Sequence, residues 1–412
     1  MKVILAGYKT AMQEELKAIL DFWMTHTVDE SNGGFIGQID YKNKIINEAP
    51  KGAVLNARIL WSFSAAYNLT GNTTYLSFAE RAFNYICTYF IDKEYRGVYW
   101  SVDHKGKPLD TKKQVYALAF TIYAFSEFYK ATKNPTAISE AIDLYDVINK
   151  YSYDKINGGY TEAFTREWET IADLRLSDKD ANEKKSMNTH LHLLEAFTAL
   201  YQVWHYEPVK KRITELAQNF MQHIIDPVTN HQYLFFDEKW QPRSSTISYG
   251  HDIETAWLLQ EAAEVVGDAD LIKSTKHIAV SMSDAVRKGL DDDGGLWYEY
   301  EPEALHLTKE KHMWPQAEAM VGYFNAWQNT ADKTYLDISL ASWQFVQQHI
   351  HDKQNGEWHW GVVRTRLSVG TCLEACSYEP MQKDKVGIWK CPYHNSRACI
   401  EIIKRINHVE KL

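Results

Sequence analysis

Six positions carry side chains that can exchange protons or bind a polar ligand, and they recur at intervals of 58 to 80 residues. Each is expected near the start of a helix in successive repeats, so the six groups should converge on one axis. They are Arg58, Tyr116, His190, His251, Trp314 together with Glu318, and His394.

Two of these positions include a carboxylate on the same helical face. His251 and Glu254 stand at i, i+3, and Trp314 and Glu318 stand at i, i+4. A carboxylate beside an imidazole orients the ring and raises its pKa, which suits acid–base catalysis. The spacing therefore predicts that Glu254 is the partner of His251.

Metal and nucleotide chemistry receive little support. His190 and His192 point about 200° apart on a helix, so only one of them can face the axis. The repeat series favours His190 and leaves His192 as a structural residue. Cys372 and Cys376 have no second pair at zinc-finger spacing, so no metal site is predicted. Motifs for serine acyl transfer, phosphate loops and Rossmann cofactors are missing from their required contexts, and no cofactor is predicted.

The elements that must position these residues follow an internal repeat. Glycine-aromatic turns recur near residues 33, 97, 158, 294 and 356, with a degenerate copy near 231. Two helical patterns lie between successive turns. The more charged, amphipathic set predicts outer helices, roughly at 10–26, 73–91, 135–150, 208–225, 269–288 and 333–350. The set richer in Ala, Leu, Trp and Tyr predicts inner helices, roughly at 53–68, 113–130, 187–205, 250–266, 313–329 and 393–406.

Twelve helices in six pairs predict an all-α fold, an (α/α)6 barrel that buries one continuous core and carries short β-hairpin-like turns on one rim. No linker divides the chain, so residues 1–412 are predicted to form one domain. Two connections, 161–186 and 361–392, exceed the repeat and enter inner helices from the same side. Long loops on one rim are where sites are usually built.

The composition excludes several classes of partner. The 45 Lys and Arg against 54 Asp and Glu give a net charge of −9, which disfavours nucleic-acid binding. No apolar run approaches the ~20 residues of a membrane span. Without a recognisable secretory signal, and with five cysteines, the chain is expected in the reducing cytoplasm. The 14 Trp, 25 Tyr and 16 Phe suit either a large core or a cleft whose flat rings pack on sugars.

Three local sequences around histidines resemble cellobiose 2-epimerases of the N-acylglucosamine 2-epimerase superfamily. They are 188–196, 251–259 and 389–395, and the stretches 56–61 and 314–319 are similar as well. The resemblance runs from about residue 10 to 406. It implies the (α/α)6 fold, which the repeat predicts independently, and a reaction that needs no cofactor.

The resemblance also implies roles for individual residues. His251 and His394 are expected to be the acid–base pair, with Glu254 orienting His251. His190 and Arg58 are expected to polarise the carbonyl end of the sugar. Substrate contacts are expected from Tyr116, Asn188, Trp257, Trp314, Glu318 and Trp389.

The predicted function is epimerisation at C2 of the reducing-end glucose of β-1,4-linked disaccharides, converting cellobiose to glucosyl-mannose and lactose to epilactose. Two imidazoles on opposite walls would remove and return the C2 proton through an enediolate. The expected partner is a small disaccharide, with no nucleic acid and no membrane, and the chain is expected to be a monomer or weak homodimer. The alternatives are an N-acylhexosamine 2-epimerase, a mannose or other aldose–ketose isomerase, an inverting glycoside hydrolase using Glu254 and Glu318, and a sugar-binding protein without chemistry.

Overall fold

The computed structural model describes residues 1–366 and 376–411, and within these ranges twelve α-helices form six hairpins. The outer member of each pair is α1 (Lys2–His26), α3 (Thr73–Tyr85), α5 (Pro135–Tyr151), α7 (Glu207–Asn219), α9 (Ala269–Val286) or α11 (Lys333–Phe345). The inner member is α2 (Ala53–Thr70), α4 (Val115–Thr132), α6 (Met187–Val203), α8 (Tyr249–Val266), α10 (Met313–Thr330) or α12 (Tyr393–Val409). Single turns of π-helix extend three outer helices, as η1 (Ile86–Phe90), η2 (Phe220–Ile224) and η4 (Val346–Ile350), and the 3-10 turn η3 (Arg287–Gly289) follows α9.

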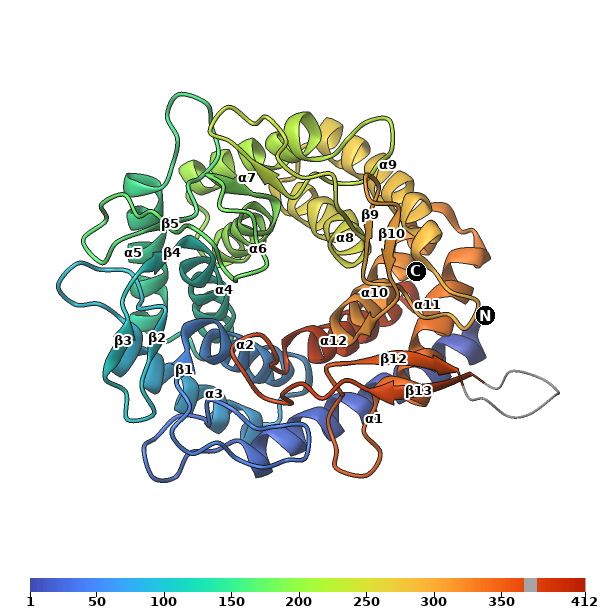
Figure 1. Cartoon of the computed structure of the whole chain (residues 1–412), viewed down its shortest axis with the longest axis horizontal. Helices are drawn as coiled ribbons and strands as arrows, with labels where there is room; N and C mark the ends of the chain where they lie inside the picture. The colour runs from blue at the N-terminus through green and yellow to red at the C-terminus, as the bar shows by residue number, and fades with distance from the viewer. Residues whose placement is uncertain (367–375, 412) are drawn as a thin grey trace.

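The inner helices form a closed ring. Each packs against the next in chain order, and α12 returns to pack against α2 (Figure 1). The outer helices surround this ring, so the predicted (α/α)6 barrel is confirmed. The first outer helix begins at Lys2 rather than near residue 10, because Leu5 and Tyr8 extend its buried stripe toward the N-terminus.

Burial explains the different compositions of the two sets of helices. In α2 every residue from Ala53 to Ala66 is buried, whereas α3 buries only one face. An inner helix contacts neighbours on all sides, and an outer helix keeps a solvated face for its charges. Across the part of the chain that the structure describes, no helix combines the length and the apolar character that crossing a membrane requires.

Short strands on one rim join neighbouring repeats, as the sequence predicts. The strand that precedes an inner helix pairs antiparallel with a strand of the next repeat, for example Lys185 with Phe236. Three-stranded sheets order as β1–β2–β3, β10–β9–β8 and β11–β12–β13, and β4–β5 and β6–β7 are two-stranded. The strands are β1 (Lys51–Gly52), β2 (Ser101–Val102), β3 (Pro108–Asp110), β4 (Lys113–Gln114), β5 (Ala163–Phe164), β6 (Lys185–Ser186), β7 (Phe235–Phe236), β8 (Ile247–Ser248), β9 (Glu299–Glu301), β10 (His306–Thr308), β11 (Lys311–His312), β12 (Gly361–Arg366) and β13 (Cys376–Pro380).

A buried lysine–aspartate pair ties the rim of most repeats to the start of an inner helix. The aspartate opens the glycine-aromatic turn and accepts backbone N–H groups within it, as Asp154 does from Ile156 and Asn157. The lysine stands before the inner helix. The pairs are Lys51–Asp29 at 2.7 Å, Lys113–Asp92 at 2.8 Å, Lys185–Asp154 at 2.9 Å, Lys311–Asp291 at 2.8 Å and Lys385–Asp352 at 2.5 Å. In the remaining repeat, Ile247 occupies the corresponding position before α8.

Removing one of these lysines should destabilise the barrel strongly. Lys185→Met leaves the Asp154 carboxylate and two carbonyls without their buried cation, and we expect the free energy of unfolding to fall by about 3 kcal/mol. The control Lys333→Met breaks an exposed pair with Asp337 and should cost less than about 1 kcal/mol. Equilibrium denaturation of both variants at neutral pH provides the comparison, and equal losses would contradict the proposed contribution of the buried pairs.

Candidate active site

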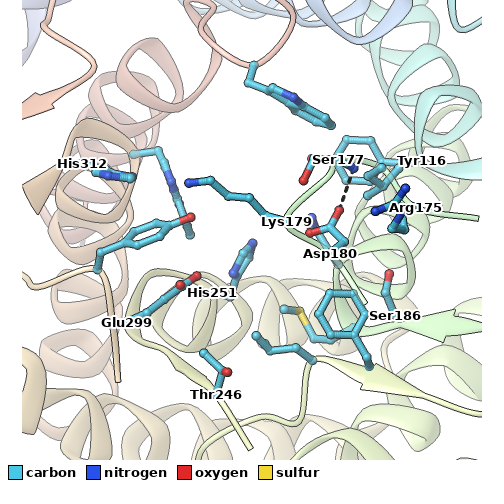
Figure 2. Close-up of a pocket in the computed structure, with 18 of the residues that line it drawn as sticks. Tyr116, Arg175, Ser177, Lys179, Asp180, Ser186, Thr246, His251, Glu299 and His312 are labelled. Atoms are coloured by element: carbon cyan, nitrogen blue, oxygen red, sulfur yellow. Dashed lines mark hydrogen bonds between the residues drawn. The ribbon is translucent and has the colours of Figure 1, made fainter. Parts of the chain in front are cut away.

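A cavity of 810 Å³ opens on the rim where the inner helices begin. First-turn and second-turn residues of the inner helices form its floor and walls. The two long connections predicted to build a site border it: residues 174–181 of the first line its outer part, as do residues 381–390 of the second. Figure 2 shows Lys179 and Asp180 of the first connection on the same cavity as His251 and Tyr116.

His251 lies in the cavity wall on the first turn of α8. Its Nδ1 shares a hydrogen bond of 2.8 Å with the Ser248 hydroxyl, and its ring packs against Trp314 with centroids 4.6 Å apart. Gly250 permits this contact, because a side chain there would meet the Trp314 ring. Burial, and then electrostatic interactions with His192 and Arg58, lower the pKa of His251 to about 3, so the imidazole is neutral at pH 7.

His394 on α12 also contacts Trp314, with ring centroids 5.6 Å apart. Its Nδ1 bonds Glu318 Oε1 at 2.6 Å, which fixes the ring and leaves Nε2 as the remaining nitrogen for proton exchange. Burial, and then the charges of Arg58 and Arg397, lower the pKa of His394. Two imidazoles therefore contact one indole in the same cavity.

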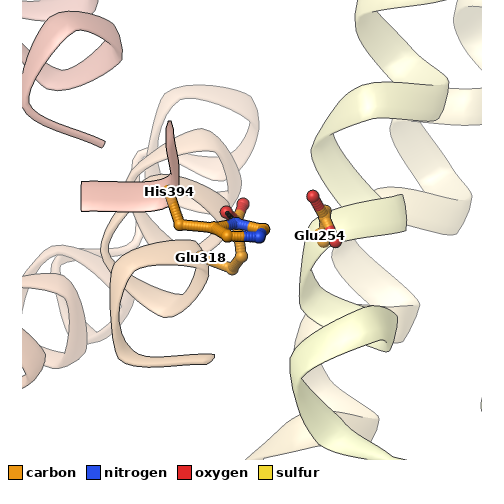
Figure 3. Close-up of side chains that lie close together, drawn as sticks. All are labelled: Glu254, Glu318 and His394. Atoms are coloured by element: carbon orange, nitrogen blue, oxygen red, sulfur yellow. Dashed lines mark hydrogen bonds and ion pairs between the residues drawn. The ribbon is translucent and has the colours of Figure 1, made fainter. Parts of the chain in front are cut away.

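Glu254 does not orient His251, so the predicted pairing is wrong. Its carboxylate bonds Arg397 and lies close to Glu318 of the adjacent helix α10 and to His394 (Figure 3). Burial, and then repulsion by Glu318, raise the pKa of Glu254 to about 7. Spacing along one helix suggested the His251 pair, but the closure of the ring brings partners from α10 and α12 to this carboxylate.

For the two histidines of α6 the prediction is reversed: His192 lines the cavity and His190 does not. His190 lies outside the cavity: its Nδ1–H donates to the Ser186 carbonyl at 2.6 Å, and its Nε2 accepts from the Tyr160 N–H at 2.9 Å. Both nitrogens are thus used by backbone. His192 lines the cavity instead, and its Nδ1–H donates to Glu195 Oε2 at 3.0 Å.

Three further predicted residues reach the cavity from neighbouring helices. Arg58 Nη2 donates to the Tyr116 hydroxyl at 2.8 Å, and the guanidinium lies 4.1 Å from the centre of the Phe120 ring. Asn188 lines the cavity, and its buried Oδ1 has no hydrogen-bond partner among the residues that the structure describes. A cation, a phenol and an amide thus converge on the wall that also holds His192.

Two predicted substrate contacts lie behind the cavity wall. Trp257 is 1% exposed and its Nε1–H donates to Glu318 Oε2 at 3.1 Å. Glu318 is 1% exposed as well, and its bonds go to Trp257, His394 and Arg397. Neither residue lines the cavity, so these two predictions of substrate contact are not supported by the geometry. Glu318 bonds His394 directly and Trp257 bonds Glu318, so both residues help to hold the His394 ring.

Trp314 and Trp389 do line the cavity, as expected. Trp389 contacts Trp100 and Tyr116, with ring centroids 5.8 and 6.0 Å apart, and therefore presents a broad aromatic surface at the mouth. The following Lys390 is anchored by an ion pair with the fully buried Glu357, which also accepts a hydrogen bond of 2.6 Å from Asn395. These bonds fix the segment between Trp389 and His394.

Sequence reasoning missed several groups of the site. Besides His192, these are Glu195, Glu162 and Arg397. Glu162 lines the cavity, accepts bonds from Ser186 and Thr189 at the start of α6, and has its pKa raised to about 8 by burial. A signal for His192 exists: it stands seven residues after Lys185, as the cavity-lining Arg58 does after Lys51.

One cluster has the composition of a metal site. Ligand atoms of Glu254, Glu318 and His394 lie within 4.8 Å of one another. However, Arg397 Nη2 contacts both carboxylates, so a guanidinium already supplies the positive charge between them. Of the cysteine pair examined for metal binding, Cys372 and the side chain of Cys376 lie outside the described residues, as does part of the 361–392 connection.

The chain matches known proteins over nearly its whole length. The family model for N-acylglucosamine 2-epimerase (GlcNAc 2-epimerase) matches residues 34–375. The cellobiose 2-epimerase of Bacteroides fragilis is 46% identical, with 96% of this chain and 98% of that protein covered. The cellobiose 2-epimerase of Dictyoglomus turgidum is 37% identical over 94% of this chain and 96% of its own length.

A solved structure gives the same result. Cellobiose 2-epimerase from Bacillus thermoamylovorans B4167 superimposes with a TM-score of 0.88 at 36% identity, covering 98% of this chain and 100% of that one. Sequence, fold and the arrangement of imidazoles on one cavity agree with the predicted class of carbohydrate epimerase. The chain therefore belongs to the N-acylglucosamine 2-epimerase family.

Proposed function

We propose that this protein epimerises C2 of the reducing-end glucose of β-1,4-linked disaccharides, converting cellobiose to glucosyl-mannose and lactose to epilactose. The observation that carries this proposal is that His251 and His394 both contact Trp314, from the two helices that pack against α10, and each has its Nδ1 already bonded to protein. The relatives named cellobiose 2-epimerase support the choice of substrate.

The reaction begins once the sugar ring has opened and an aldehyde stands at C1. One imidazole takes the C2 proton, and the electron pair of the C–H bond moves toward C1 to form an enediolate. The other imidazole must enter this step protonated: it delivers that proton to the opposite face of C2 and becomes neutral, the first imidazole keeps the proton taken from C2, and the aldehyde re-forms. The two histidines exchange roles in the reverse direction, so no hydrogen acceptor other than the protein is needed.

The enediolate needs donors at its oxygens. Arg58 and Tyr116 offer a guanidinium and a phenol on the cavity wall, and Asn188 has an unpaired amide oxygen that suits a sugar hydroxyl. His192 takes the place in the site that was predicted for His190, because His192 is the one that reaches the cavity, and its Nε2 can accept a hydrogen bond from a sugar hydroxyl. A cation placed before the reaction stabilises the developing charge without reorganisation.

The second sugar should lie toward the mouth. Trp389, together with the 174–181 segment, borders that part of the cavity, and 810 Å³ leaves room beyond one reacting glucose. A flat indole packs on the apolar face of a sugar, while Lys179 and Asp180 offer polar contacts to hydroxyls. This placement favours a disaccharide over the monosaccharide substrates of the rival isomerase and N-acylhexosamine epimerase.

Product formed from cellobiose in D2O tests the function and the mechanism together. If a solvent-exchanged imidazole delivers the proton, glucosyl-mannose should carry deuterium at C2, as seen by NMR. His251→Ala and His394→Ala should each lose epimer formation by at least ~1,000-fold, because each direction requires one acid and one base. His277→Ala, on the exposed face of α9, is the matched control and should retain wild-type rates.

Other products would reject the proposal in distinct ways. A ketose as the main product would indicate an aldose–ketose isomerase, and free glucose would indicate a hydrolase. Faster turnover of N-acetylglucosamine than of cellobiose would indicate an N-acylhexosamine epimerase. Undiminished epimerisation by either alanine variant would rule out the assigned pair.

The two histidines of α6 should respond differently to the same change. His192→Gln removes a group from the cavity and should lower kcat by ~100-fold or more with a small effect on folding. His190→Gln leaves the cavity intact but disturbs two buried backbone bonds, so it should lower the free energy of unfolding by about 1–3 kcal/mol and largely keep kcat. Kinetics on cellobiose and equilibrium unfolding of both variants decide this, and the reverse pattern would restore His190 to the site.

Trp389 should matter more for a disaccharide than for glucose. Trp389→Ala removes the aromatic surface at the mouth, and we expect kcat/KM for cellobiose to fall by ~10-fold or more while that for glucose changes little. The wild-type protein should also prefer cellobiose to glucose. Equal losses for both sugars would place Trp389 at the reacting sugar instead of the outer one.

A further inference from the structure

We propose that Arg397 is a positioning residue that holds two imidazoles of the site through two separate carboxylates: His192 through Glu195 and His394 through Glu318. The inference deepens the proposed function and rests on it for its kinetic consequences. Arg397 belongs to α12, one turn after His394, and is 1% exposed. It does not line the cavity, so it acts through its neighbours.

The guanidinium divides its donors between two groups of partners. Nη1 bonds Glu195 and the hydroxyl of Tyr393, and Nη2 bonds Glu254 and, at 2.7 Å, Glu318. The four partners come from α6, α8, α10 and α12. A planar fork with fixed N–H directions can hold carboxylates from different helices in one plane, which an ammonium cannot do.

Two of these carboxylates also form a hydrogen bond with an imidazole that faces the cavity. Glu195 uses its other oxygen to accept from His192 Nδ1–H at 3.0 Å. Glu318 accepts from His394 Nδ1 at 2.6 Å with the same oxygen that contacts Arg397. Each bond places hydrogen on Nδ1 and leaves Nε2 as the basic nitrogen. One side chain thereby fixes the tautomer and orientation of imidazoles in two different walls.

The charge of Arg397 is as important as its geometry. Burial alone would raise the pKa of Glu195, but Arg397 and His192 lower it to about 2, so this carboxylate stays ionised as a hydrogen-bond acceptor. The charged and titratable groups around His394 come from every neighbouring helix and include Glu318, Glu254, Arg58, His192, Glu195 and Arg397. Removing the Arg397 charge makes this surrounding more negative, which should raise the pKa of His394.

Arg405 provides a matched comparison on the same helix. It lies two turns after Arg397, and its Nη1 bonds the neutral amides of Asn325 and Gln328. Arg405 also packs on Trp257, as Arg397 does, but the carboxylate beside it is that of Glu401, which holds no histidine among the described residues. Arg405→Met therefore reports what the loss of a packed arginine from α12 costs when no imidazole depends on it.

The experiment combines kinetics on cellobiose with imidazole NMR of protein labelled with 15N at histidine. We expect Arg397→Met to lower kcat by ~100-fold with little change in KM, to move the acid limb of kcat/KM to higher pH, and to shift or broaden the Nδ1–H signals of His192 and His394. Arg397→Lys keeps the charge but not the fork, so it should lower kcat and shift both signals with a smaller change in the pH profile. Arg405→Met should retain the wild-type kcat, pH profile and signals.

Each result of these measurements either supports or overturns the positioning role of Arg397. If Arg397→Met does not fold, Arg397→Lys and Glu195→Gln carry the test, and Glu195→Gln should shift the His192 signal more than the His394 signal. Unchanged imidazole signals in the folded Arg397 variants would overturn the inference, as would losses that match those of Arg405→Met. The NMR measurement needs no turnover, so a wild-type protein that is inactive on cellobiose would reject the proposed function while still testing the position of Arg397.

Discussion

In five of the six described repeats, a buried lysine–aspartate pair holds the turn on the rim against the start of the inner helix. An aspartate fixes the turn that enters the repeat, and a lysine standing before the inner helix reaches into that turn, as Lys185 does to Asp154 at 2.9 Å. Such a pair costs desolvation and repays it only when the geometry is good, so it specifies one register in place of several similar ones. Because most repeats share this anchor, residues at the same distance from it lie at the same level around the axis.

That common level explains which parts of the site the sequence predicts. Helix pairs, ring closure and the long rim connections follow from periodicity, and Arg58, Tyr116 and Asn188 were correctly expected at the cavity. His190 was not, because neighbouring helical positions differ by only about 100° and a turn count made from approximate helix boundaries cannot resolve them. The distance from the lysine offers a signal for His192, which stands as far from Lys185 as Arg58 does from Lys51. The count marks the level along the axis and not the exposure to the cavity, because Glu318 stands at the same distance from Lys311 and lies behind the wall.

Which side chains bond to one another was harder to predict than which residues lie at the cavity. Local spacing assigned Glu254 to His251, but the bonds that matter join distant parts of the chain: Glu318 to His394 across 76 positions and Glu254 to Arg397 across 143. An i, i+3 relation shows that two groups share a helical face, and it does not say which groups from other helices face them. Arg397 carried no motif that could mark it, because its importance arises only when four inner helices converge.

The same convergence fixes how many protons the site can hold. Glu195, Glu254 and Glu318 carry three negative charges when ionised, and Arg58 and Arg397 carry two positive ones, so the cluster has room for one more proton before it is neutral. Two neutral imidazoles alone would offer two bases and no acid. Glu254, with its pKa raised to about 7 and an oxygen within 4.8 Å of a nitrogen of His394, can hold that proton. Epimerisation moves one proton onto carbon and one off it, so the net charge of this buried cluster is the same before and after each turnover.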